Sequence, residues 1–410
     1  MQRPPTEGLR LFRIVLTVGI AGATLLRLAR TFPSHAELRN DFGAFVAAGR
    51  ALRASENPYI LDPRLVPSLA GYAPMLSAPP ILPFADLVGT VDPLLGLRAV
   101  ILLSAVAYAV LGMILLRRLP AKRRLLGAAW LVSLDCLWAT LTEGQIYCFL
   151  ALAVIGAWTL LDRHPIAAGV LMGIAVAVKP NLLLWPAMLA LAGAWAPALA
   201  CVASAMPLAL ISAFAYGPGV YRDWIMYALA GSRDSYAAPM NGSLPTVFIH
   251  VGLPALAVPM SVLLVGLLML LVWRQQPGTR AVSNIAIIAA VFVSPIAWTG
   301  YLLLALPTFF GKRINIPLLL AGALMVFPIS FLPEVTPLTT ARALASVIAP
   351  MLFALLTVGA IAPVVVPPGG QNEVVGVRGR MAGDLHGRFG ALGRLHQSRK
   401  FRPGEISDGR

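Results

Sequence analysis

Long apolar runs recur along most of the chain. One of them, LLGLRAVILLSAVAYAVLGMILL at 94–116, has the length of about 20 residues that a helix needs to cross a bilayer. Only 12% of the residues are charged and 58% are hydrophobic, whereas soluble domains carry about 25% charged residues. Because a helix satisfies its own backbone hydrogen bonds in lipid, these runs predict an all-α, polytopic membrane protein without a separate soluble domain.

The apolar runs can be divided into about twelve transmembrane spans, several of them shorter than the ideal length. We interpret residues 12–30 as a retained first helix, because no small-residue cleavage site follows this run. Residues 65–92 are apolar but rich in proline, which predicts an interfacial or re-entrant segment. The expected organisation is a transmembrane domain over 1–366 and a disordered, Gly- and Arg-rich tail over 367–410.

Positive charge is concentrated in short clusters between the apolar runs. The formal net charge is +15, and the densest cluster before the tail is RRLPAKRR at 117–124. Such clusters mark the cytoplasmic side, so they indicate membrane topology and lipid contact rather than nucleic-acid binding. With both termini cytoplasmic in the cell membrane, residues 31–93 form an extracytoplasmic first loop.

The cysteines and carboxylates indicate no metal site and no cofactor. Cys136, Cys148 and Cys201 lie in or beside apolar stretches without the spacing of metal ligands. We interpret them as buried thiols, with a bridge between Cys136 and Cys148 as the alternative. No group of carboxylates offers a divalent cation a binding site.

Polar and ionisable residues collect in a few places, all on the predicted outer side. Such residues are costly at membrane depth and indicate function or pairing. A proton relay would distribute its carboxylates through the thickness of the membrane. Because these residues all lie on the outer side, they favour a site at the outer interface. There a carboxylate can serve as a general base and a lysine can stabilise a leaving phosphate, as group transfer from a lipid phosphate requires. The residues concerned are Asp41, Glu143, Gln145, Lys179, Asn181, Asn241 and Ser243.

Each of these residues also has a structural interpretation. Asp41 suits the N-cap of an amphipathic helix that begins with DFGAF, and Lys179 suits a side chain that reaches to the membrane interface. Glu143 and Gln145 suit a polar loop. The NGS stretch at 241–243 suits a turn and helix cap, and it is formally a glycosylation sequon.

Several short motifs occur in an order that resembles glycosyltransferase family 87. This family comprises polytopic mannosyltransferases of the GT-C type, which take mannose from a polyprenyl-phosphate donor. The resemblance covers about residues 15–330. The motifs are DFxxFxxAGRAL with NPY (41–59), YAPMLSAPP (72–80) followed by Pro83, EGQIYCFLAL (143–152), GVLMGIAVAVKPNLLLWP (169–186), NGSL (241–244) and SPIAW (294–298).

The resemblance implies an inverting transfer of a hexose, most simply mannose, to a glycolipid or polysaccharide acceptor. Asp41 matches the catalytic aspartate of the first loop, Gln145 the GQ loop, and Lys179 the lysine before proline. Lys179, Arg39 and Arg50 are the cations expected to face the leaving phosphate. The complete expected substrate site comprises Arg39, Asn40, Arg50, Tyr59, Tyr72, Glu143, Gln145, Lys179, Asn181, Asn241, Ser243, Trp298 and Tyr301.

The last motif departs from the family pattern. Family members tend to continue this motif with two histidines, whereas the present chain has Gly300 and Tyr301 after Thr299. An inactive relative therefore stays open as an alternative. So do a different donor sugar and a transporter or flippase of lipid-linked sugars, although no internal repeat supports a transporter.

Overall fold

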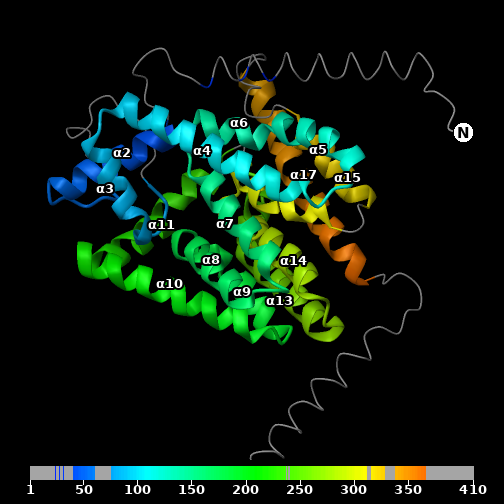
Figure 1. Ribbon diagram of the computed structural model, residues 1–410. Coiled ribbons are helices and arrows are strands. Elements are labelled where there is room, and N and C mark those ends of the chain that lie inside the picture. The colour runs from blue at the N-terminus through cyan, green and yellow to red at the C-terminus, as the bar shows by residue number, and fades with distance from the viewer. Residues whose placement is uncertain are drawn as a thin grey trace, which may run out of the picture. The chain divides into compact units, whose positions relative to one another are not determined.

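The computed structural model describes residues 40–60, 75–236, 241–311, 315–327 and 338–365, together with positions 24, 27, 31 and 238. Over these residues the chain forms helices and no strand (Figure 1). The chain divides into two units, Met1–Val364 and Val365–Arg410. The predicted tail and most of the predicted first helix lie outside the described residues.

The helices vary widely in length and include several 3-10 segments, labelled η. In chain order they are α2 (Asn40–Arg53), η2 (Pro79–Ile81), α3 (Leu82–Thr90), α4 (Pro93–Leu116), α5 (Ala121–Ser133), α6 (Asp135–Thr142), α7 (Tyr147–Leu160), α8 (Pro165–Val178), η3 (Pro180–Leu183), α9 (Leu184–Leu191), α10 (Trp195–Tyr216), α11 (Gly219–Tyr236), α12 (Leu244–His250), η4 (Pro254–Leu256), α13 (Ala257–Gln275), α14 (Thr279–Phe292), η5 (Thr299–Phe310), α15 (Ile316–Leu324) and α17 (Leu338–Val365).

Long apolar helices confirm that this is a membrane protein. Among the described residues, 4 helices are long and apolar enough to cross a membrane, and α5 with α6, bent by 44°, would make 5. Other apolar helices, such as α7 and α14, are shorter and largely buried. The count of about twelve spans is therefore not confirmed, because hydropathy alone does not separate a membrane span from a short helix inside the bundle. The candidate spans are α4, α10, residues Pro254–Gln275 and residues Leu344–Ala362.

Close helix packing in the bundle depends on glycine. α8 lies against α10 (Figure 1), and a β-carbon on Gly169 would lie 2.4 Å from the carbonyl oxygen of Pro197. One on Gly173 would lie 2.5 Å from the carbonyl oxygen of Cys201. Small residues let membrane helices approach to backbone contact, so these glycines set the distance between α8 and α10.

The hairpin of α2 and α3 also has a glycine contact. A β-carbon on Gly49 would lie 1.9 Å from the carbonyl oxygen of Ala85, and one on Gly89 would lie 2.8 Å from the carbonyl carbon of Gly49. α3 has 9 residues and is too short to cross a bilayer alone. These glycines therefore let α2 and α3 approach to backbone contact.

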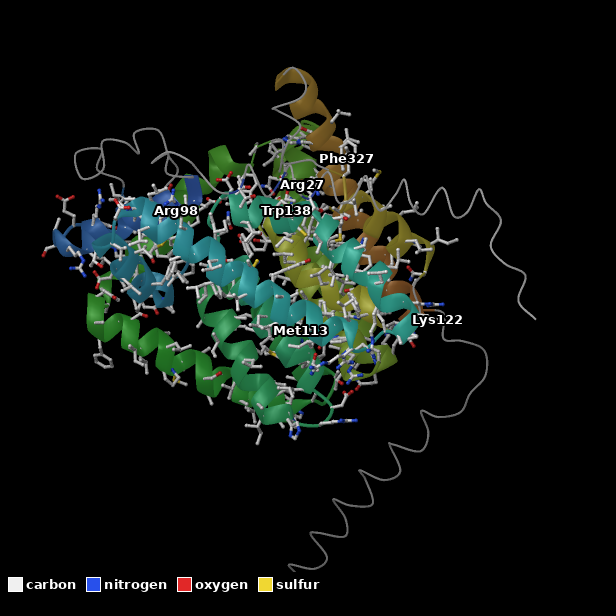
Figure 2. The ribbon with its side chains drawn as sticks, turned by 45° about the horizontal axis from the view of Figure 1, so that its top comes forward. Arg27, Arg98, Met113, Lys122, Trp138 and Phe327 are labelled. Atoms are coloured by element: carbon white, nitrogen blue, oxygen red, sulfur yellow. The ribbon has the colours of Figure 1, made fainter. Side chains whose placement is uncertain are left out.

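The helices α4, α7 and α8 have two chemically different ends. Near the start of α4, the ring of Phe42 lies 3.0 Å from the position of a β-carbon on Gly96. Beyond the other end of α4, the guanidinium of Arg118 lies 4.7 Å from the ring of Trp158, and Arg280 pairs with Asp162 at 2.8 Å. Figure 2 shows Arg98 near the first of these ends, and Met113 and Lys122 toward the second. A helix of 24 residues such as α4 is about 36 Å long, so the basic end lies far from Phe42.

Candidate active site

The candidate site begins where the first turn of α2 meets the turn between α6 and α7. The backbone N–H of Phe42 donates to the carbonyl oxygen of Glu143 at 3.0 Å, which satisfies one of the free N–H groups at the start of the helix. Gly144 has a φ of +62°, and a β-carbon there would lie 2.8 Å from the β-carbon of Phe42. Glycine is therefore required for this turn to approach α2.

Asp41 lies in the first turn of α2, beside that connection. Its carboxylate oxygen Oδ2 accepts a hydrogen bond from Nε2 of Gln145. The pKa of Asp41 is raised to about 7, mainly by burial and also by the negative charge of Glu143, while the positive charge of Lys179 opposes both. A carboxylate with a pKa near neutrality has the acid strength that suits a general base at neutral pH.

Lys179 is brought to the same place by the end of α8. Pro180 follows it, and the residue before a proline avoids the helical region, so Lys179 adopts φ −130° and ψ 84°. Its ammonium nitrogen lies 5.4 Å from the centre of the Tyr147 ring and 5.2 Å from that of Tyr301. These two rings are 4.6 Å apart, between the start of α7 and the start of η5. A cation and a base from distant segments thus share one site.

The described residues bring together no group of three or more histidine, cysteine, aspartate or glutamate side chains that could hold a metal ion. Cys136, Cys148 and Cys201 are free, buried thiols, which confirms the interpretation from sequence. The groups available for chemistry are a carboxylate with a pKa of about 7, an amide N–H donor and an ammonium group.

Asn241 and Ser243 tie the NGS segment to the SPIAW segment. Nδ2 of Asn241 donates to the carbonyl oxygen of Pro295 at 2.9 Å, and its Oδ1 accepts from the backbone N–H of Ala297 at 2.8 Å. The Ser243 hydroxyl donates to Pro295 as well, at 3.1 Å, and accepts from the backbone N–H of Thr246 as the N-cap of α12. These hydrogen bonds connect the NGS segment to the SPIAW segment. The helix cap predicted for NGS is present at Ser243.

The other predicted residues that the structure describes contact other parts of the protein. Asn181 donates to the carbonyl oxygen of Ala290 at 3.3 Å, and Tyr59 is fully buried with its hydroxyl on the carbonyl of Ser77. Arg50 lies roughly 13 Å along α2 from Asp41, at 1.5 Å per residue. Trp298 accepts at its carbonyl from the N–H of Tyr301. Arg39 and Tyr72 lie outside the described residues, as does the side chain of Asn40.

Two features were missed from the sequence. One is Tyr147, which contacts Lys179. Its position directly after the GQ motif could have indicated that it belongs to the site. Asp135 is buried at the bend between α5 and α6, where its charge interacts with that of Arg27. Arg27, labelled in Figure 2, donates to the carbonyl oxygen of Ser133 at 2.9 Å. An acidic residue inside the apolar run before TEGQ could have predicted a buried charge with a basic partner.

Comparison with known families gives a match over more than half of the chain. The model of glycosyltransferase family 87 matches residues 72–307, which is more than half of the chain and includes Gln145, Lys179 and Tyr301, while Asp41 precedes the matched segment. Comparison with curated proteins and with solved structures found no match. Both the family and its GT-C type agree with the helical membrane bundle, and the chain therefore belongs to glycosyltransferase family 87.

Proposed function

We propose that this membrane glycosyltransferase transfers a hexose, mannose in the first instance, from a polyprenyl-phosphate-sugar to a glycolipid or polysaccharide acceptor. The observation that carries the proposal is the meeting of Asp41 with Gln145, Glu143 and Lys179 at one end of the helices. This arrangement provides a base for an acceptor hydroxyl and a cation for a leaving phosphate.

In the proposed reaction the acceptor hydroxyl oxygen attacks the anomeric carbon of the sugar. A new glycosidic C–O bond forms as the bond between the anomeric carbon and the phosphate oxygen breaks. The bonding electrons leave with the polyprenyl monophosphate, and the acceptor proton passes to Asp41. A single displacement of this kind inverts the anomeric configuration. Lys179 stabilises the negative charge that grows on the phosphate oxygens, while Gln145 orients the carboxylate.

The same geometry supports an extracytoplasmic location for the site. The start of α4 lies beside Phe42, next to Asp41, and the basic residues after its other end are those that favour the cytoplasm. Arg118, Arg163 and Arg280 gather at that basic end. With the basic end in the cytoplasm, Asp41 and Lys179 face the extracytoplasmic side of the membrane.

The test is sugar transfer by purified protein in detergent. Polyprenyl-phosphate-[14C]mannose is supplied with a glycolipid extract, and the donors carrying glucose and a pentose are run beside it. Asp41→Asn should reduce transfer by about 100-fold or more, the range for a positioned general base. The matched control is Asp92→Asn, since Asp92 is an exposed N-cap of α4 and asparagine caps as well as aspartate.

The outcomes separate the alternatives. Transfer from the glucose or pentose donor alone would correct the sugar and leave the reaction in place. Movement of lipid-linked sugar across liposomes without product would indicate a transporter. A wild-type protein that binds donor and transfers no sugar to any acceptor fraction would indicate an inactive relative. Wild-type transfer rates in the Asp41→Asn protein would show that another group is the base.

A further inference from the structure

Tyr147 and Tyr301 form an aromatic surface under the ammonium group of Lys179. The nitrogen lies 5.4 Å and 5.2 Å from the two ring centres, within the roughly 6 Å range of a cation–π contact. Both tyrosines are buried, with 2% and 6% of their surface exposed, whereas Lys179 is half-buried. The rings are therefore fixed by packing and the lysine is the accessible member.

Gly300 allows the two rings to meet. A β-carbon on Gly300 would lie 2.6 Å from Cδ2 of Tyr147 and 3.0 Å from its Cε2. Any side chain at this position would collide with the ring. The ring of Tyr147 thus occupies the space beside residue 300, and from there it lies 4.6 Å from the ring of Tyr301.

The contact leaves the ammonium available to a ligand. Within the described part of the chain, Lys179 forms no ion pair within 4.0 Å, and the aromatic faces attract its charge without accepting its N–H groups in ordinary hydrogen bonds. A lysine ammonium has three such donors. A carboxylate partner would neutralise the charge and occupy donors, whereas the two rings hold the charge in place and leave the donors for phosphate oxygens.

We propose that Tyr147 and Tyr301 are positioning residues that hold the Lys179 ammonium as the binding site for the monophosphate of the lipid substrate. This inference rests on the proposed function, because it assigns the phosphate of that substrate to Lys179. It assigns a role to Tyr301, where this chain departs from the family pattern, and to Tyr147, which lies in a motif that matches it. The tyrosines act through Lys179, and neither of them contacts the phosphate itself.

The experiment measures binding, so that it does not depend on sugar transfer. Farnesyl phosphate is titrated into the purified protein in detergent, and farnesol, which lacks the phosphate, is the matched ligand. The variants are Tyr301→Leu, which removes the ring, Tyr301→Phe, which keeps it, Lys179→Met, and the double variant Tyr301→Leu with Lys179→Met. Tyr108→Leu is the control for a buried tyrosine elsewhere, since Tyr108 donates to the carbonyl of Leu131.

Tyr301→Leu should weaken farnesyl phosphate binding by about 2- to 30-fold, the range of one cation–π contact, and leave farnesol binding unchanged. Tyr301→Phe should stay within about 2-fold of wild type, because the ring carries the effect. In the Lys179→Met background the further loss on Tyr301→Leu should disappear, which a general loss of packing would not produce.

Three results would overturn the proposal. These are additive losses in the double variant, an equal loss in Tyr301→Phe and Tyr301→Leu, and a wild-type protein that binds farnesyl phosphate no better than farnesol. Failure of the proposed function looks different: the wild-type protein would bind farnesyl phosphate through Lys179 and yet transfer no sugar. Folding of each variant is checked by its elution volume and unfolding midpoint, with Tyr108→Leu as the reference for lost packing.

Discussion

Replacing Asp41 by asparagine should stabilise the protein at neutral and alkaline pH although it removes the proposed base. Burial and the neighbouring charge of Glu143 disfavour the ionised carboxylate. Asparagine has nearly the same shape and can accept the hydrogen bond from Gln145, but it carries no charge. The substitution should therefore lower transfer activity and raise the free energy of unfolding.

The magnitude follows from the pKa of Asp41, which rises from 3.8 to about 7 in the folded protein. Because the folded-state pKa is raised, the folded protein binds more protons than the unfolded chain between these values, and stability falls as pH rises through this window. At 1.36 kcal/mol per pH unit, the ionised carboxylate costs about 4 kcal/mol at most. The Asp41→Asn protein should match wild type near pH 4 and exceed it increasingly up to about pH 7.

The measurement is the thermal unfolding midpoint in detergent from pH 4.5 to 8.5 for wild type, Asp41→Asn and Asp92→Asn. The difference between Asp41→Asn and wild type should widen with pH and then level off above about pH 7, while Asp92→Asn should follow wild type throughout. A constant offset across the range, or a variant that becomes less stable as pH rises, would refute the inference that burial disfavours the ionised carboxylate of Asp41. Either result would make Asp41 an ordinary capping or paired residue.

Three further predictions test the site and the topology. Glu143→Gln should lower the pKa of Asp41, because the charge that raises it is lost. The acidic limb of the kcat/KM profile should then move to lower pH. Complete loss of transfer would instead identify Glu143 as the base. Asn241→Ala should lower the free energy of unfolding by about 1–3 kcal/mol, since it leaves buried backbone groups of the SPIAW segment without partners; an unchanged unfolding midpoint with a raised donor KM would assign Asn241 to substrate instead. A cysteine placed at Ser55 should react with a membrane-impermeant thiol reagent in intact cells and one placed at Arg380 should not, and the reverse pattern would invert the predicted topology.

The sequence was informative about the site wherever a polar residue interrupted an apolar run. Lys179 was found in this way, because a charge in an otherwise apolar segment is costly and stands out. Asp41 and Gln145 were found in short polar stretches on the same predicted outer side. The structure brings these residues together, although they come from segments far apart in the chain. A polar residue in an apolar segment can thus be recognised from the sequence before the fold is known.

Aromatic residues gave no such signal. Tyr147 resembles an ordinary core residue in the sequence, and Tyr301 was expected at the site only through the family resemblance. The contact that both make with Lys179 depends on how α7, α8 and η5 pack. The number of spans is not confirmed for a related reason. Apolar composition is the same in a lipid-facing helix and in one buried in the bundle, and only the three-dimensional packing separates the two.

The space beside residue 300 yields a last prediction about how Gly300 and Tyr147 depend on each other. Histidine, which the family tends to have at this place, would put its β-carbon 2.6 Å from Cδ2 of Tyr147 and 3.1 Å from Oγ1 of Thr140. Gly300→His alone should therefore be destabilised by about 1–3 kcal/mol, as other overpacked sites are.

Removing the ring should relieve that collision. Tyr147→Ala alone should also lose stability, because it leaves a cavity, yet Gly300→His should cost far less in the Tyr147→Ala background than in the wild type. The coupling between the two substitutions should reach about 0.5–3 kcal/mol, measured as unfolding midpoints of the single and double variants. Gly278→His is the control, since nothing lies within 4 Å of a β-carbon there. If the two losses simply add, the ring of Tyr147 does not fill the space of the missing side chain, and Gly300 is tolerated for a reason unrelated to Tyr147.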